Sequence, residues 1–384
     1  MTTVTIQPRL IRWARERAGL AVGDLVEKFP KFPLWEMGDA MPTMRQLEAL
    51  AVRTRTPFGY FFLPEPPEEE LPITDYRTMK DGGIRRPSPD LLETVQTMQR
   101  RQDWMRDYLI EEGEDPLPFV GTASKSDRVA KTVEAIRHTL GLTEGWARGC
   151  GSWDDALRHF RNAVEGTGVL VATNGVVGNN TQRKLDVSEF RGFVLSDRYA
   201  PLVFVNGADA KAAQMFTLAH EVAHVWLGRG GLFDLPDVPG NGDSVEKYCN
   251  HVAAELLVPE IEFRERWSTA RHAERPFADL ARWFKVSEVV AARRALELRL
   301  MGLAEFDAFY DEYRKRLDSV RSAKPKSGGG DYFRNQDVRL GRRFGYAVVR
   351  AAKEGRLLYR DAYALTGLRS GTFQRYMKHL VARG

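Results

Sequence analysis

The hydrophobic pattern along the chain is mostly helical. Apolar residues recur at intervals of three and four over long stretches, which is the spacing of one face of an α-helix. Before residue 168 the predicted helices span 8–63 (a small bundle), 89–112, 127–140 and 153–164. After residue 215 they span 216–227, 244–259, 277–292 (with a helix-turn-helix outline) and 296–320.

Three short runs between these helices have a different pattern. They are rich in β-branched and aromatic residues and are bounded by Gly, Asp, Pro and Asn, which is typical of strands. The predicted strands span 168–172, 190–195 and 202–205. Together with the helices they predict an α+β, mostly helical protein with one small β-sheet.

Two stretches interrupt the periodic pattern and predict linkers. Residues 63–72 are rich in Pro and Glu, and residues 322–330 contain Lys, Pro, Ser and Gly. We therefore expect a helical N-terminal module (1–65), a linker (66–88), an α+β domain (89–275), its helical extension (276–321), a second linker (322–330) and a helical C-terminal module (331–384).

The helix predicted at 216–227 carries a His-Glu-x-x-His pattern. His220 and His224 are four residues apart, so on a helix both imidazoles lie on one face and can bind one divalent ion, normally zinc. Glu221 is adjacent, where its carboxylate can take a proton from a metal-bound water. The alternative is that both histidines are core residues of an apolar helix.

A third ligand is expected from the helix predicted at 244–259, because a hydrolytic zinc site has three protein ligands. Glu246 lies in its first turn and Asn250 one turn later, which suggests a ligand followed by a residue that orients a histidine from the outer shell. Glu255 is the rival ligand. Cys249 and His251 are expected to be packing residues.

Composition limits the class of protein. The chain has 384 residues, 43% of them hydrophobic and 28% charged, and lacks an apolar run near the ~20 residues that span a membrane. The first residues do not form a signal peptide, and two cysteines, Cys150 and Cys249, give neither a disulfide framework nor a cysteine metal cluster. We expect a cytoplasmic protein without a membrane partner.

Basic charge is concentrated at one end. The whole chain carries +5, whereas residues 331–384 contain twelve Lys and Arg against four acids, a balance of +8. The same segment is rich in aromatic residues, and 356–376 reads as helix, Gly-containing turn, helix. DNA is therefore a candidate partner. The alternative is a solvated basic face over an aromatic core.

The segment 192–259 resembles the ImmA/IrrE family of zinc metallopeptidases. The matching stretches are Gly-Phe-Val-Leu-Ser-Asp at 192–197, Pro-Leu-Val-Phe-Val-Asn at 201–206, Phe-Thr-Leu-Ala-His-Glu-Val-Ala-His at 216–224 and Ala-Ala-Glu-Leu-Leu-Val-Pro at 253–259. The resemblance implies a zincin-like domain with one zinc ion per chain. It also implies a protein substrate, a helix-turn-helix repressor of a mobile-element, toxin-antitoxin or stress-response system.

The N-terminal module resembles an XRE-like helix-turn-helix domain, because Trp-Glu-Met-Gly-Asp-Ala-Met-Pro-Thr at 35–43 matches the turn after the recognition helix. Pro30 and Pro33, however, lie where that helix is expected, and proline disfavours a helix interior. Base-reading side chains are also missing from 29–34. The module is therefore expected either to bind DNA or to dock a partner, including a second copy of the chain.

Two functions follow. In the first, the chain is a zinc-dependent endopeptidase, with His220, His224 and Glu246 as ligands and Glu221 as the catalytic base. In the second, it is a DNA-binding regulator or antitoxin-like partner whose peptidase-like domain is structural or sensing. The candidates for stabilising the oxyanion are Tyr199, Tyr248 and His251.

Overall fold

The computed structural model describes residues 3–69, 87–229, 231–233, 244–321 and 332–382. The chain divides into two compact units, Met1–Gln96 and Thr97–Gly384. Most of the linker predicted at 66–88, and all of the one predicted at 322–330, lie outside the described residues. Within the described part of the chain, no helix is both long enough and apolar enough to cross a membrane.

The first unit is a bundle of short helices. Its helices are α1 (Pro8–Arg17), α2 (Gly23–Val26), α3 (Phe32–Met37), α4 (Met44–Thr54) and the 3-10 helix η1 (Phe58–Phe62). Ile11, Phe32, Trp35 and Leu47 are buried in its core. The Arg15 guanidinium donates to the buried Glu36 carboxylate at 2.8 Å, which joins α1 to α3.

The prolines at 30 and 33 do not remove the third helix. Pro30 precedes α3, and Pro33 lies in its first turn, where the missing N–H would have no intrahelical acceptor. The helix has only six residues, and Gly38 ends it in the left-handed conformation with φ 87°. It exposes the apolar side chains of Leu34 and Met37.

The sheet of the second unit has the strand order β1-β5-β4-β6. β1 (Leu170–Asn174) runs parallel to β5 (Leu202–Asn206), while β4 (Gly192–Leu195) is antiparallel to both β5 and β6 (Gly231–Phe233). The three strands predicted from the sequence are present. β6 was not predicted, because its Gly-rich surroundings read as loop.

A second, two-stranded sheet was not predicted either. It pairs β2 (Val176–Val177) with β3 (Asn180–Lys184). β3 consists of Asn, Thr, Gln, Arg and Lys, most of them exposed, so no alternation of apolar and polar residues marks it.

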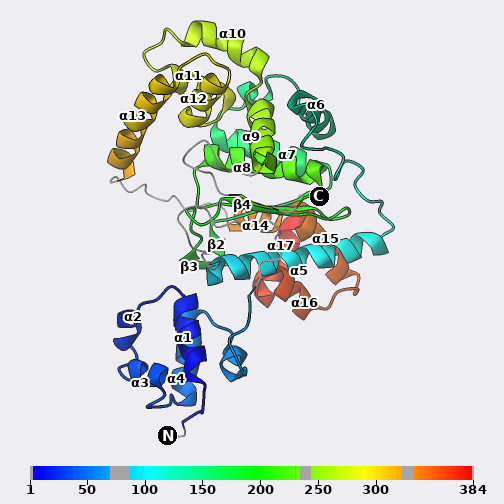
Figure 1. Cartoon of the computed structure of the whole chain (residues 1–384). Coiled ribbons are helices and arrows are strands. Elements are labelled where there is room, and N and C mark those ends of the chain that lie inside the picture. The colour runs from blue at the N-terminus through cyan, green and yellow to red at the C-terminus, as the bar shows by residue number, and fades with distance from the viewer. Residues whose placement is uncertain (1–2, 70–86, 230, 234–243, 322–331, 383–384) are drawn as a thin grey trace. The chain divides into compact units, whose positions relative to one another are not determined.

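Helices cover both faces of the main sheet (Figure 1). One face carries α8 (Lys211–Leu227), with α6 (Val129–Leu140), α7 (Trp153–Gly166) and α9 (Ser244–Leu257) around it. The other face carries the part of α5 (Pro89–Glu111) that lies in this unit. There the buried Gln102 side-chain amide donates to the carbonyls of Leu195 (2.7 Å) and Ala200 (2.9 Å).

The helices after α9 differ from prediction in two places. They are α10 (Glu260–Ala270), α11 (Pro276–Phe284), α12 (Glu288–Glu297) and α13 (Leu303–Arg321), of which α10 was not predicted and lies before the extension expected at 276–321. The single helix predicted at 296–320 is wrong, because α12 ends at Glu297 and α13 starts at Leu303. Between them Arg299 adopts a left-handed φ of 57°, which a continuing helix does not allow.

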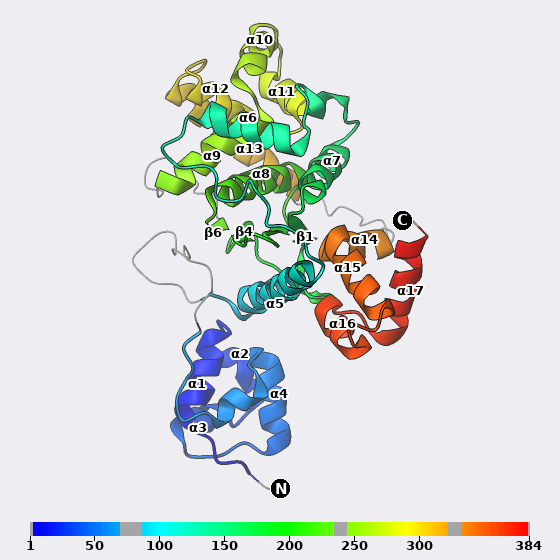
Figure 2. The same cartoon turned by 90° about the vertical axis from the view of Figure 1, so that its right-hand side faces the viewer.

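The C-terminal module packs beside β1 (Figure 2). It contains α14 (Tyr332–Leu340), α15 (Arg342–Lys353), α16 (Tyr359–Thr366) and α17 (Ser370–Val381). Phe344, Phe373 and Tyr376 are buried in it, so these aromatic residues form core. The whole chain is thus α+β and mostly helical, as predicted.

Candidate metal centre

The central helix of the site is α8, which lies between the sheet and α9. Its residues from Gln214 to Trp226 are all buried, including His220, Glu221 and His224. Gly228 ends the helix in the left-handed conformation with φ 64°. It packs so closely on Gly121 that a Cβ atom at residue 228 would lie 2.8 Å from the Gly121 Cα. The predicted helix is therefore present and inserts three ionisable side chains into the protein interior.

His220, His224 and Glu246 converge on one point. His220 Nε2 is 3.1 Å from Glu246 Oε2, and His224 Nε2 is 3.2 Å from Glu246 Oε1. The two Nε2 atoms are 3.0 Å apart, and one ligand atom from each of the three residues lies within 4.8 Å of the others. Glu246 comes from the first turn of α9, so two helices supply this set.

Asn250 orients one of the histidines. It lies one turn after Glu246 on α9, and its Oδ1 is 3.1 Å from His220 Nδ1. When His220 Nδ1–H donates to this oxygen, the lone pair of Nε2 is directed at the cluster, as metal binding requires. The Nδ1 atom of His224 has no such partner among the described residues.

Glu221 is a buried acid without a neutralising contact. Neither carboxylate oxygen has a hydrogen-bond partner within the described part of the chain. Burial, and then the nearby charge of Glu246, raise the pKa of Glu221 well above its usual value. An ionised carboxylate in this position is costly unless a cation or a polar ligand lies next to it.

The charges of the ligand set also suit a cation. Burial alone would raise the pKa of the Glu246 carboxyl, but its contacts with the imidazoles of His220 and His224 outweigh burial and hold that pKa well below normal. Burial lowers the pKa of His220, which favours the neutral imidazole that can coordinate a metal. Two imidazoles, one ionised carboxylate and an unsatisfied buried acid fit a divalent ion.

Glu255, the rival ligand, points elsewhere. It is nine residues after Glu246 on α9, and nine residues at 3.6 per turn place it on the opposite side of the helix. Its carboxylate accepts hydrogen bonds from the Arg294 guanidinium and from the backbone N–H of Glu260. Its role is to join α9 to α12.

The other nearby side chains have separate environments. Cys249 is buried, and burial raises the pKa of its thiol well above normal, so it packs as a neutral group. The Tyr248 hydroxyl is 2.7 Å from Thr132 Oγ1, and His251 is exposed. Tyr199 follows the Leu195 end of β4, whereas the opposite end of β4 approaches Glu221.

That opposite end is Gly192, to which the sequence patterns assigned no role in the site. A Cβ at Gly192 would lie 2.5 Å from Thr217 Cγ2 and 3.1 Å from Glu221 Oε1. Gly192 pairs with Phe233 of β6, so this edge of the sheet is next to Glu221. The approach joins segments distant in sequence, which explains why local pattern did not reveal it.

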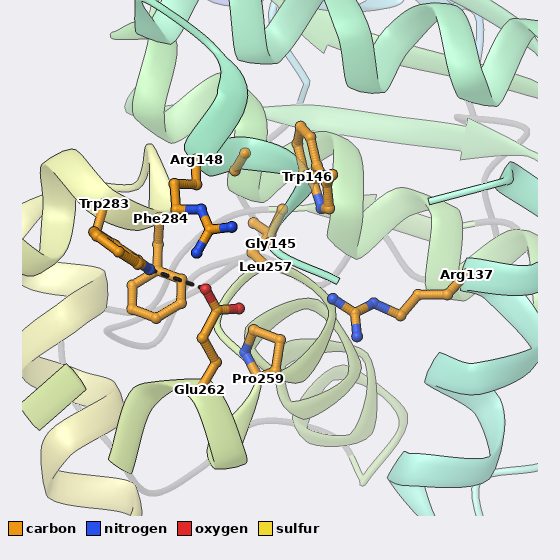
Figure 3. Close-up of a pocket in the computed structure, with 10 residues that line it drawn as sticks. Arg137, Gly145, Trp146, Arg148, Leu257, Pro259, Glu262, Trp283 and Phe284 are labelled. Carbon is orange, nitrogen blue, oxygen red and sulfur yellow. Dashed lines mark hydrogen bonds between the residues drawn. The ribbon is translucent and has the colours of Figure 1, made fainter. Parts of the chain in front are cut away.

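A pocket elsewhere in this unit does not contain these residues. It lies beside α6, α10, α11 and the 3-10 helix η2 (Trp146–Gly149), and Figure 3 shows Arg137, Arg148 and Glu262 around it. The Trp283 indole N–H donates to Glu262 Oε1 at 2.9 Å, and the Trp283 ring contacts the guanidinium groups of Arg148 and Arg266. The contacts of Trp283 join α10, α11 and η2, whereas the buried Nε atoms of Arg137 and Arg266 have no hydrogen-bond partner among the described residues.

Comparison with known families assigns two segments. Residues 168–296, from just before β1 to the end of α12, match the model of the peptidase M78 family, described as IrrE N-terminal-like domain. Residues 340–379, which include α15 and α16, match a model described as Domain of unknown function (DUF8813). No curated protein matches the chain.

Proposed function

Because residues 168–296 match the model of the IrrE N-terminal-like domain, we propose that this protein is a zinc-dependent endopeptidase. The observation that carries the proposal is the convergence of His220, His224 and Glu246 beside the buried carboxylate of Glu221. Three protein ligands leave one position for water or substrate, which is the arrangement of catalytic rather than structural zinc.

His220, His224 and Glu246 would hold the ion, and nitrogen and oxygen donors of this kind suit zinc. Zinc bound there supplies a Lewis acid that polarises the scissile carbonyl and makes water easier to deprotonate. Asn250 keeps His220 in the tautomer that presents Nε2.

Glu221 would act as the general base and acid. Its raised pKa makes the carboxylate a stronger proton acceptor than an exposed glutamate. It takes the proton of the attacking water at one carboxylate oxygen and then gives that proton to the leaving amine. Burial keeps bulk water from competing for the proton.

The neighbouring edge of the sheet suits an extended peptide. β6 is last in the strand order and pairs with β4 at Gly192, next to Glu221. A peptide that hydrogen-bonds to this edge would pass the site with its backbone held in register, which is a general mode of peptide capture. The family resemblance further suggests that the substrate is a helix-turn-helix repressor encoded in a mobile-element, toxin-antitoxin or stress-response system.

Metal content tests the ligand set. We expect about one zinc per chain in the wild-type protein and in Glu255→Ala. Glu246→Ala should contain much less zinc, because only this substitution removes a ligand. Elemental analysis after dialysis against a weak chelator measures this. Equal metal in both variants would exclude Glu246 as a ligand, and metal-free wild-type protein would make His220 and His224 core residues.

A further inference from the structure

The last two helices of the C-terminal module form a compact corner. Gly367 ends α16 in the left-handed conformation with φ 67°, and its N–H donates to the Tyr363 carbonyl at 2.8 Å. Residues 367–369 then connect directly to α17, and Leu368 in this turn is buried. Two helices joined by a short, glycine-containing turn are typical of a helix-turn-helix.

One side of α17 anchors the helix. Phe373, Tyr376 and Leu380 are each at most 1% exposed and lie on its inner face. Their spacing of three and four residues fixes the rotation of the helix, because it leaves the remaining positions facing outward. The outer face is therefore determined by packing.

That outer face carries side chains that can read DNA. The exposed positions Gly371, Gln374, Arg375 and Lys378 follow one stripe along the helix, with spacing i, i+3, i+4 and i+7. Arginine pairs with guanine and glutamine with adenine in the major groove, and lysine contacts phosphate. Gly371 leaves the start of the stripe without a side chain, so the backbone can approach a ligand there.

The basic groups of this stripe are available. Arg375 Nε donates only to the Gly371 carbonyl of its own helix, at 3.4 Å, and no acid of the described residues pairs with Arg375 or Lys378. In contrast, Arg350 and Arg356 elsewhere in the module form ion pairs with Glu112 and Glu354. Arg375 and Lys378 thus place two unpaired positive charges on the exposed face of α17.

We propose that α16 and α17 form a helix-turn-helix that binds duplex DNA, with α17 entering the major groove. The proposal does not depend on peptidase activity. The N-terminal module is a poorer candidate, because its six-residue α3 exposes the apolar Leu34 and Met37 in place of base-reading side chains. DNA binding through α17 would bring the metallopeptidase-like domain to DNA.

Binding of the full-length protein to a fluorescent, random-sequence DNA duplex of about 30 base pairs tests the proposal, by anisotropy over a range of salt concentrations. Arg375→Ala/Lys378→Ala should weaken binding roughly ten- to a hundredfold. The slope of the logarithm of the binding constant against the logarithm of the salt concentration should become shallower by about one to two. Lys28→Ala/Lys31→Ala removes the same charge from exposed positions of the N-terminal module and should bind like wild type.

A second variant tests whether α17 reads bases. Gln374→Ala should change the base preference obtained by selection from a random pool at one or two positions, while its affinity for the random duplex stays close to that of wild type. All substituted side chains are exposed, and unchanged thermal unfolding would verify the fold.

Several results would overturn the proposal. They are an absence of wild-type binding at low salt, an equal loss of affinity in the N-terminal control variant, and an unchanged base preference in Gln374→Ala. Equal affinity for an RNA duplex would also contradict it, because a helix cannot enter the narrow major groove of A-form RNA.

Discussion

Glu221 and Glu246 are acids in the same site with opposite environments. Glu246 contacts two imidazoles, which hold its pKa well below normal despite its burial, whereas burial raises the pKa of Glu221 well above normal. Environments that separate two carboxylic acids in this way are typical of sites where one acid binds a charge and the other moves a proton. The division of roles that we propose for the two acids rests on these different contacts.

The proposed role of Glu221 predicts a specific loss. Glutamine has nearly the same shape but cannot accept the proton, so Glu221→Gln should keep about one zinc per chain and lose roughly a hundredfold or more in cleavage rate. The check is intact-mass spectrometry of a candidate helix-turn-helix repressor co-expressed with each form, together with elemental analysis.

Glu265→Gln is the matched control, since it makes the same change at an exposed position of α10 and should cleave normally. A Glu221→Gln protein as active as this control would exclude Glu221 as the base.

At the scale of single residues, the sequence predicted those features of the site that depend on spacing along a helix. The four-residue interval places His220 and His224 together, and the rotation between Glu246 and Glu255 on α9 separates the two acids. Gly192 could not be predicted in the same way. Its contact with Thr217 and Glu221 depends on how β4 packs on α8, which no local pattern contains.

Among the elements, the hydrophobic pattern predicted those with a strong apolar face. The strands at β1, β4 and β5 were predicted because all or nearly all of their residues are buried. The break between α12 and α13 was missed because Leu298, Leu300 and Met301 continue the apolar spacing. A backbone reversal at Arg299 leaves that spacing intact, so periodicity alone cannot detect it.

A buried acid links α7 to the C-terminal module. Glu165 Oε1 accepts a hydrogen bond from the backbone N–H of Arg342 at 2.9 Å, at the start of α15. Burial raises the pKa of Glu165 to about 7, although the charges of Arg161 and Arg342 oppose the shift. The folded protein therefore keeps this carboxyl protonated at pH values where the unfolded chain has already ionised it.

This shift predicts a pH-dependent loss of stability. Below the unfolded pKa of about 4.5 both states are protonated, and the contribution of Glu165 is fully present. As pH rises to about 7 only the unfolded chain releases the proton, so the free energy of unfolding should fall, by about 3 kcal/mol at most. Glu165→Gln keeps the acceptor oxygen and removes this titration.

Urea unfolding of both proteins at about pH 4.5 and pH 7.5 measures the difference. Relative to wild type, the free energy of unfolding of Glu165→Gln should be higher at about pH 7.5 than at about pH 4.5. Glu134→Gln, at an exposed position of α6, should follow wild type at both pH values. If the free energy of unfolding changes equally between the two pH values in Glu165→Gln and in wild type, Glu165 titrates normally in the folded protein.

On the scale of the whole molecule, the C-terminal module packs against the domain that matches the peptidase M78 model. The sequence indicated a separate basic segment, because charge and composition change after residue 330. The structure places α14 beside β1, and Gly341 is close enough for a Cβ to come within 2.9 Å of the Val171 carbonyl oxygen. A basic composition describes the outer surface of the module and carries no information about the face that packs.

Arg101 on α5 is the polar centre of this packing. Its side chain is buried, and its guanidinium donates to the carbonyls of Leu365 (2.9 Å) and Arg339 (3.2 Å) while it contacts the ring of Phe344. Burial lowers the pKa of Arg101 to about 10, so it is still charged at neutral pH. A buried cation held by main-chain carbonyls costs much if either side of the contact is removed.

Arg101→Ala should therefore loosen the C-terminal module. The substitution leaves two carbonyls without their donor and opens a space beside Phe344, which we expect to cost about 2–4 kcal/mol. Limited proteolysis should release a fragment from the C-terminal module faster than in wild type, and the midpoint of thermal unfolding should fall. Arg100→Ala removes the adjacent, exposed arginine and should behave as wild type in both measurements. Equal protease resistance of the two variants would mean that Arg101 does not hold the module, and that apolar packing between α14 and β1 suffices.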